Sequence, residues 1–311
     1  MIASAYLAAD GFHEPLEEEL ARRGAAILFW HGDLAVSSSP PVPAAWSLNT
    51  WLAPREIKFE SIGQAASALR AVQRNWGSYQ ADHFRRAALI AAKLPPIRTR
   101  TQPFPAEPPS GHLGAWTLLA PDRLLASPTQ SSAFINGAVT FDEDRVGPPS
   151  RAYLKLWEAC TLLGAWPAPG ERCLDLGASP GGWTWALAKL GALVVAVDRA
   201  PLEPRIAAMP GVSERLESAF GIDPAAEPPV DWVFSDVIAY PQRLLTLVQA
   251  WIASGKTRHI VCTLKFQGAT DHVAAEAFAA IGGGRVVHLF HNKHELTFLW
   301  RRDEGKEAVL F

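Results

Sequence analysis

Hydrophobic runs in the second half of the chain are short, and they alternate with longer helix-forming stretches. Short apolar runs bounded by turn residues are typical of buried strands. Strands and helices that alternate in this way predict a mostly parallel sheet covered by helices on both faces, which is an α/β fold. The predicted strands are 172–176, 193–197, 232–235, 260–264 and 287–289, and the predicted helices are 182–190, 241–253 and 270–281.

The end of the chain breaks this alternation. Only a few polar residues separate the last two apolar runs, 287–290 and 296–300. A crossover between parallel strands needs a dozen or more residues. We therefore expect the last strand of the sheet to run antiparallel.

The first half of the chain is interrupted by proline at 40–43, 95–96 and 103–109. Proline cannot continue a helix or a central strand, so these stretches indicate turns and linkers. Between them the pattern predicts a smaller α+β region. Its expected elements are a strand at 5–8, a helix at 14–23, a strand pair within 26–36, a helix at 61–75, and a hairpin formed by 113–119 and 123–126.

The change of pattern predicts three segments. We expect an N-terminal α+β region at 1–110, a hairpin and linker at 111–145, and a larger α/β domain at 146–311. A chain of 311 residues is long enough for two compact units of ordinary domain size.

The composition fits a folded protein, because 49% of the residues are hydrophobic and 19% are charged. No apolar run approaches the roughly 18 residues of a membrane span, and the first residues do not resemble a secretory signal. We therefore expect a cytoplasmic protein. The nine histidines show no metal-binding spacing, and no structural metal is expected. Three cysteines lie in apolar runs without a C-x-x-C pair, and we interpret them as core residues: Cys160, Cys173 and Cys262.

The net charge of the chain does not indicate a nucleic-acid partner. Residues 1–150 carry 13 basic and 14 acidic side chains, and residues 151–311 carry 16 and 17. Because binding to phosphates normally needs a basic surplus, any RNA contact must come from local patches. Candidates are the loop 291–294 and the arginines Arg98, Arg100, Arg301 and Arg302.

The segment 173–183, CLDLGASPGGW, is the most informative part of the chain, because an apolar strand ends there in a glycine-rich turn that opens a helix. Ligands bind at the carboxyl ends of strands in open α/β sheets, and glycine lets the backbone approach them. The turn does not match G-x-G-x-x-G, which disfavours a dehydrogenase. Asp198 ends the next strand, where a carboxylate can accept hydrogen bonds from both ribose hydroxyls of a nucleoside cofactor.

Two lysines and two carboxylates flank predicted elements near this turn. Taken singly, each is more often a surface charge than a catalyst, but together they predict a catalytic site. Asp236 follows one strand, Lys265 ends the next, and Glu295 begins the last. Lys155 lies on a predicted helix that has Ser150 as its N-cap and Gly164 just past its end.

The order Lys155, Asp236, Lys265, Glu295 resembles the K-D-K-E tetrad of FtsJ-type RNA ribose 2'-O-methyltransferases. The turn that starts at Asp175 matches their D-x-G-x-x-P-G-G-W sequence. Together with 147–151, these motifs look most like the bacterial RlmM group, which methylates 23S rRNA. The resemblance covers residues 145–302.

The resemblance implies a Rossmann-like, S-adenosylmethionine-dependent methyltransferase domain that modifies a ribose 2'-hydroxyl in RNA, with 23S rRNA as the expected partner. A lysine base needs a lowered pKa, which a second ammonium or desolvation supplies. Lys265 is then expected to accept the proton or to stabilise the developing alkoxide. Lys155 would tune Lys265 and orient the ribose, and Asp236 and Glu295 would position the two lysines. The expected cofactor contacts are Ser150, Asp175, Gly177, Ser179, Pro180, Gly181, Gly182, Trp183, Asp198 and Asp236.

The chain departs from the family at two places. Ser218 stands where the family supplies an acidic contact near the adenine. The family also has a longer N-terminal half with a THUMP-type RNA-binding module, which we expect to be truncated or absent, so the region 1–110 keeps only a candidate RNA-binding role. Two alternatives stay open: a methyltransferase of a non-RNA acceptor, and a non-catalytic, ribosome-associated RNA-binding protein.

Overall fold

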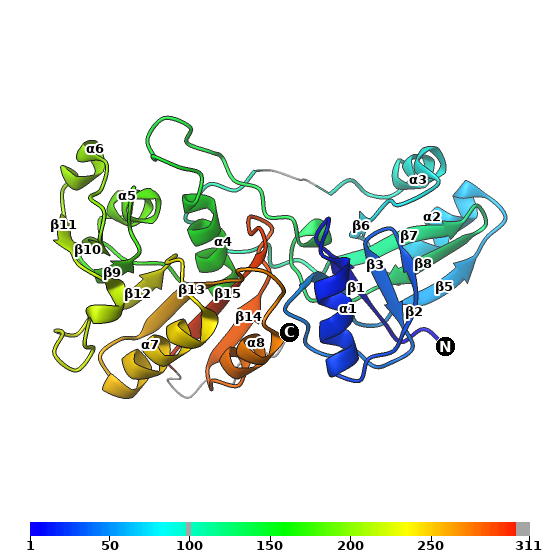
Figure 1. Cartoon of the computed structure of the whole chain (residues 1–311). Coiled ribbons are helices and arrows are strands. Elements are labelled where there is room, and N and C mark those ends of the chain that lie inside the picture. The colour runs from blue at the N-terminus through cyan, green and yellow to red at the C-terminus, as the bar shows by residue number, and fades with distance from the viewer. Residues whose placement is uncertain (98–100, 303–311) are drawn as a thin grey trace. The chain divides into compact units, whose positions relative to one another are not determined.

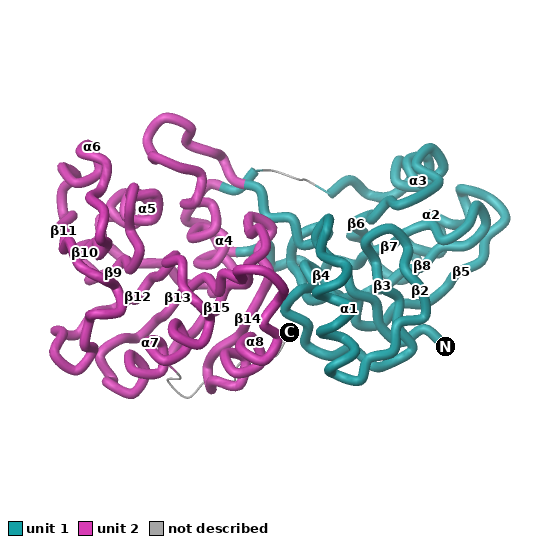
Figure 2. Tube along the Cα trace, viewed as in Figure 1, with its two compact units in different colours: residues 1–102, 108–140, 310–311 teal, residues 103–107, 141–309 magenta. Residues whose placement is uncertain are grey.

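A computed structural model describes residues 1–97 and 101–302, and the chain forms two compact units. Among the described residues, unit 1 contains 1–97, 101–102 and 108–140, and unit 2 contains 103–107 and 141–302 (Figure 2). Within the described ranges, every helix is too short or too polar to cross a bilayer. Arg98 and Arg100, two of the candidate phosphate contacts, lie outside the described residues.

The first sheet of unit 1 is antiparallel throughout (Figure 1). It confirms the predicted first strand, first helix and strand pair, and it adds a fourth strand whose polar sequence, SLNTW, gave no strand pattern. Its elements are β1 (Ser4–Ala8), α1 (His13–Arg22), β2 (Ile27–His31), β3 (Leu34–Ser37) and β4 (Ser47–Trp51), in the sheet order β2-β3-β1-β4.

The predicted hairpin forms the centre of a second sheet in unit 1. It is not part of a separate 111–145 segment, because its two strands pair with one further strand on each side. Trp116 and Leu118 pack against two helices on one face, while Ala115 and Leu125 pack with the first sheet on the other. The elements are β5 (Arg55–Lys58), α2 (Ile62–Val72), β6 (Trp76–Ser78), α3 (Phe84–Ala91), β7 (Gly114–Ala120) and β8 (Arg123–Ser127), in the order β5-β8-β7-β6.

Unit 2 has the expected α/β architecture, a seven-stranded sheet in which only the last strand runs antiparallel to its neighbours. Its helices are α4 (Tyr153–Leu163), α5 (Gly182–Lys189), α6 (Pro204–Ala207), α7 (Pro241–Ser254) and α8 (His272–Ala279). Its strands are β9 (Arg172–Leu176), β10 (Leu193–Asp198), β11 (Val212–Leu216), β12 (Trp232–Ser235), β13 (His259–Lys265), β14 (Gly284–Val287) and β15 (Glu295–Arg301). The sheet order is β11-β10-β9-β12-β13-β15-β14.

Helices cover both faces of this sheet, since α4 and α5 pack together against β9, β10 and β15, and α7 and α8 pack together against β13, β14 and β15. The central strands are buried on both sides, and this explains their continuous apolar sequences. The three cysteines are buried, as predicted. The edge strand β11 was missed because its sequence, VSERL, is polar and half exposed.

One strand differs from its predicted position. The strand expected at 287–289 is β14, which ends at Val287, because it pairs with β15 from Gly284 to Val287. The strand order reverses between β9 and β12, because the chain leaves β9 for β10 and β11 and then returns to the other side of β9. Such a reversal opens a crevice at the carboxyl ends of the strands.

Candidate active site

A pocket of about 430 Å³ lies at the strand reversal of unit 2. Its wall is built by the turn after β9, the end of β10, the segment after β11 and the loop after β12. Segments far apart in the sequence meet here because they follow adjacent strands of one sheet. Its lining includes Ser150, Gly177, Ser179, Pro180, Gly182, Trp183, Asp198, Ser218, Phe220, Asp236, Ile238, Arg243 and Lys265.

The glycine-rich turn needs glycine for steric reasons. Gly177 has φ +81°, and a Cβ there would lie 2.8 Å from the Cα of Val237 in the loop after β12. A Cβ on Gly182 would lie 2.7 Å from the Oγ of Ser150. The turn therefore lies directly against both neighbouring segments of the pocket wall.

Asp198 is held in a fixed orientation at the end of β10. One carboxylate oxygen accepts a hydrogen bond from the N–H of Ser179 at 3.0 Å, and the other accepts one from the N–H of Ala200 at 3.1 Å. A carboxylate has about four acceptor positions, so two such bonds leave capacity for further donors. Asp198 also lines the pocket, where it can meet a pair of hydroxyls.

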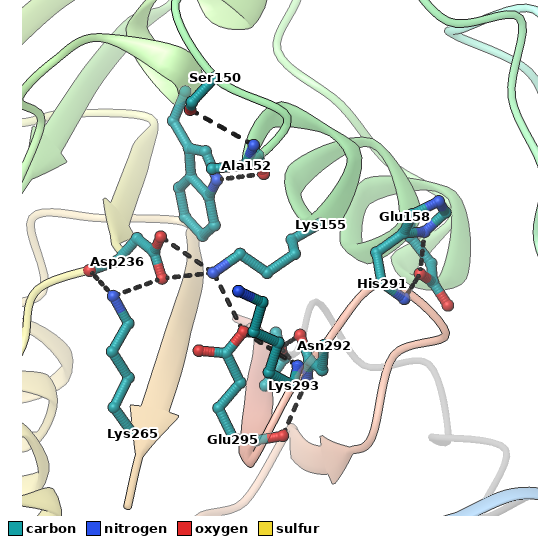
Figure 3. Close-up of polar contacts among 12 residues, drawn as sticks. Ser150, Ala152, Lys155, Glu158, Asp236, Lys265, His291, Asn292, Lys293 and Glu295 are labelled. Atoms are coloured by element: carbon teal, nitrogen blue, oxygen red, sulfur yellow. Dashed lines mark hydrogen bonds and ion pairs between the residues drawn. The ribbon is translucent and has the colours of Figure 1, made fainter. Parts of the chain in front are cut away.

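The four residues of the predicted tetrad form one connected cluster (Figure 3). The Nζ of Lys155 donates to Asp236 at 2.9 and 3.0 Å and to Oε1 of Glu295 at 3.1 Å. The Nζ of Lys265 lies 3.1 Å from Oδ1 of Asp236 and also donates to the main-chain oxygen of Asp236. Asp236 is thus the link between the two ammonium groups.

The sheet itself fixes this geometry. Lys265 and Glu295 are register partners across the antiparallel pair β13 and β15. The N–H of Asp236 donates to the carbonyl of Leu176 at the end of β9, next to the glycine-rich turn. Three neighbouring strands therefore bring their site residues to one edge.

Two members of the tetrad face the pocket and two lie behind them. Asp236 and Lys265 line it, whereas Lys155 and Glu295 are only 9% and 8% exposed. A molecule that enters the pocket therefore meets the ammonium of Lys265 before that of Lys155.

Two predicted cofactor contacts, Asp175 and Gly181, lie outside the pocket wall, while the other eight line it. The side chain of Asp175 is 1% exposed and accepts a hydrogen bond from Oγ1 of Thr184 at 2.6 Å. Burial raises the pKa of Asp175 to about 7. Its carboxyl group therefore faces α5 rather than the pocket.

The predicted N-cap of α4 is wrong. The helix begins at Tyr153 with Ala152 as its N-cap, and Ser150 accepts only a long contact of 3.4 Å from the N–H of Ala152. A main-chain hydrogen bond stabilises the start of the helix instead, since the N–H of Leu154 donates to the carbonyl of Arg151. The predicted end is confirmed, because Gly164 has φ +65°, the left-handed conformation of a C-cap.

Sequence reasoning missed a second set of lining residues. The guanidinium of Arg243 lies 4.1 Å from the ring centroid of Phe220, and both line the pocket with Ile238. Phe220 follows the unrecognised strand β11, and Arg243 lies in the first turn of α7. Among the described residues, no group of three or more His, Cys, Asp or Glu side chains could hold a metal ion.

The candidate phosphate contacts are dispersed. Arg301 pairs with His259 at the far end of β13, at the edge of the sheet opposite Lys265. Arg302 follows it and donates to the carbonyl of Thr257. Within the loop 291–294, His291 lies 2.6 Å from the buried carboxylate of Glu158. Arg301 and Arg302 therefore lie at the other end of the strands from Lys265, whereas the loop 291–294 leads into Glu295.

Comparison with known proteins identifies the type of domain. A family model described as FtsJ-like methyltransferase matches residues 148–305. Proteins named "Ribosomal RNA large subunit methyltransferase M" are 38% identical over 162 residues in Halorhodospira halophila and 37% identical over 165 residues in Azoarcus sp. strain BH72. These matches cover 50% and 48% of this chain, and 47% and 45% of the relatives.

The chain therefore spans about half the length of the relatives that it matches. Among solved structures, the fibrillarin pre-rRNA processing protein of Methanococcus jannaschii is 20% identical, with a TM-score of 0.33, over 45% of this chain and 69% of that one.

Proposed function

This chain belongs to the FtsJ-like methyltransferase family, and from that premise we propose that it transfers a methyl group from S-adenosylmethionine to a ribose 2'-hydroxyl in RNA. We propose 23S rRNA as the substrate, in line with the names of its relatives. One observation carries the proposal: Asp236 and Lys265 line the same pocket as the glycine-rich turn and Asp198.

The residues of the pocket fit the proposed cofactor. Asp198 offers acceptors for two ribose hydroxyls, and the glycine-rich turn lets the cofactor lie close to the backbone. Pro180, Val197 and Phe220 give an apolar wall suited to the adenine and the thioether carbons. When bound, S-adenosylmethionine supplies an electrophilic methyl group on a sulfonium centre.

The residues of the tetrad would prepare the acceptor oxygen. An alcohol is a weak nucleophile, so the enzyme must orient the 2'-oxygen and take its proton. Lys265 lines the pocket. After losing its own proton, its Nζ would accept the proton of the 2'-hydroxyl and later pass it to water. Lys155 would keep Asp236 and Glu295 in place from behind, through the three hydrogen bonds that it donates.

We propose that unit 1 contributes to RNA binding through its α2–α3 layer. Residues 61–97 contain five Lys or Arg and one Asp, whereas residues 1–52 contain two basic and six acidic side chains. The overall neutrality of the chain therefore hides a local basic segment. Phe84 and Leu89 of α3 are 60% and 50% exposed between these cations. Cations with an exposed aromatic ring suit phosphates and unstacked bases.

A direct test measures where the methyl group goes. The full chain is incubated with isotope-labelled S-adenosylmethionine and rRNA from a strain that lacks the gene, and the nucleosides are analysed by mass spectrometry. Label in a 2'-O-methylnucleoside is the expected result. Label on a base or on a small molecule of the extract would overturn the choice of acceptor. RNA binding without any transfer would favour the non-catalytic alternative.

A further inference from the structure

A second carboxylate lies on α4, one helical turn beyond Lys155. Glu158 is 1% exposed, and its carboxylate forms three hydrogen bonds with the loop between β14 and β15. Figure 3 shows the contacts between Glu158 and His291. The N–H groups of Phe290 and His291 donate to the carboxylate at 2.7 and 3.0 Å, and the Nδ1 of His291 lies 2.6 Å from its Oε2. The helix that carries Lys155 is thus joined to this loop.

The same loop leads directly into Glu295. The amide of Asn292 donates to the main-chain oxygen of Glu295 at 3.1 Å, and the N–H of Lys293 lies 3.5 Å from its Oε1. That Oε1 is the atom that accepts the hydrogen bond from Lys155. The register with Lys265 thus places the main chain of Glu295, and the loop adds contacts to both its main-chain oxygen and its carboxylate.

We propose that Glu158 is a positioning residue for the methyl transfer, which acts by holding residues 290–291 so that Glu295 meets Lys155. This inference rests on the proposed function. Lys155 and Glu158 lie three residues apart on α4, so one rigid helix carries both the ammonium and the group that holds its partner's loop. Burying a carboxylate is unfavourable unless hydrogen-bond partners satisfy it, and here these three partner groups belong to the loop.

Unit 1 offers a matched control for this arrangement. Glu19 of α1 is 6% exposed and accepts hydrogen bonds from the N–H groups of Ala45 and Trp46, both at 2.9 Å. Both glutamates hold two consecutive main-chain N–H groups from inside a helix. Only the loop that Glu158 binds continues into a tetrad residue. Comparing variants of the two glutamates therefore separates an effect on the position of the tetrad from an effect on stability alone.

The test compares Glu158→Gln with Glu19→Gln in the full chain. A glutamine keeps one acceptor oxygen, so each variant loses part of its main-chain binding and some thermal stability. We expect kcat of Glu158→Gln to fall by about tenfold to a hundredfold, since misplacing a site by about 1 Å costs about this much. KM for S-adenosylmethionine and kcat of Glu19→Gln should stay near the wild-type values.

A double-mutant cycle identifies the route. If Glu158 acts through Glu295, adding Glu158→Gln to Glu295→Gln should lower kcat by less than about twofold, because the two changes remove one function. Independent, multiplying losses would overturn the inference. So would equal kcat losses in the Glu158 and Glu19 variants. If Glu158→Gln does not fold, His291→Ala can be used instead, because it removes one of the three bonds. We expect His291→Ala to lower kcat in the wild-type chain but not in the Glu295→Gln variant.

Failure of the inference and failure of the proposed function give different results. Absence of transfer by the wild-type chain would reject the function. Transfer by the wild-type chain with unchanged kcat in Glu158→Gln would reject only the positioning role.

Discussion

Lys155 holds the carboxylate of Asp236 through both of its oxygens, at 2.9 and 3.0 Å, across 81 positions of the sequence. Lys265 approaches one of the same oxygens at 3.1 Å from the pocket side. The carboxylate thus separates an inner ammonium, enclosed between Asp236 and Glu295, from an outer one that lines the pocket. This asymmetry gives the two lysines different expected roles.

Replacement of Lys265 should abolish transfer and spare cofactor binding. Lys265→Met removes the proton acceptor but keeps an apolar side chain of similar length, so kcat should fall by about 10²–10⁴-fold. Binding of S-adenosylhomocysteine, measured by calorimetry, should change little. Lys189→Met, at an exposed position at the end of α5, is the control. Substantial turnover by Lys265→Met would remove Lys265 from its proposed role.

The glycine-rich turn can be tested with two glycines of the same conformation. Gly177 and Gly170 have φ of +81° and +82°, but only the Cβ of an alanine at 177 would meet the backbone of Val237. Both alanine variants should lose roughly 1–2 kcal/mol of unfolding free energy from the left-handed backbone. Only Gly177→Ala should also weaken S-adenosylhomocysteine binding, by roughly tenfold, since overpacking costs about 1–3 kcal/mol. Equal affinities in the two variants would contradict this.

Asp175 should make the stability of unit 2 depend on pH. Burial raises its pKa from 3.8 to about 7, so the folded state binds the proton more tightly than the unfolded state. Its contribution to the free energy of unfolding is therefore full below about pH 4 and is lost as the pH rises through about 7. Between pH 5 and pH 8 the free energy of unfolding of the wild type should fall by up to about 3 kcal/mol more than that of Asp175→Asn. Urea unfolding at both pH values checks this, and parallel losses would refute it.

The basic layer of unit 1 should act on RNA affinity and not on chemistry. Arg85→Ala combined with Lys93→Ala should raise the Kd for rRNA fragments and reduce the slope of log K against log salt by about 0.7 for each lost phosphate contact. The value of kcat at saturating RNA should not change. Arg22→Ala combined with Arg23→Ala at the end of α1, in the acidic part of unit 1, is the control that removes the same number of cations. Equal effects of both changes on the salt slope would argue against the α2–α3 layer.

Much of unit 2 could be predicted because its strands are buried on both faces. Their apolar runs mark the strand ends, and the site residues lie at those ends: Asp236 follows β12 and Lys265 closes β13. Strands could not be predicted in this way where they are buried on one face only or are largely exposed. The edge strand β11 carries a polar sequence, so Phe220 beyond it could not be assigned to the pocket.

Unit 1 was harder to predict because its strands are short and partly exposed. The hairpin at β7 and β8 was readable from its two apolar runs. Its partner strands β5 and β6 could not be predicted, because their sequences, REIK and WGS, contain too few apolar residues to show an alternation. The predicted division at 110/111 consequently falls inside unit 1, because strand pairing joins the hairpin to the earlier strands.

The sequence by itself determined the fold class, the glycine-rich turn and the identity of the four clustered residues, because strand ends and turn sequences are local properties. Only the tertiary structure decided which lysine reaches the pocket and which one stays behind it. It also joined Glu158 to His291, 133 positions apart, since the partner of a buried carboxylate depends on how a helix packs against a distant loop.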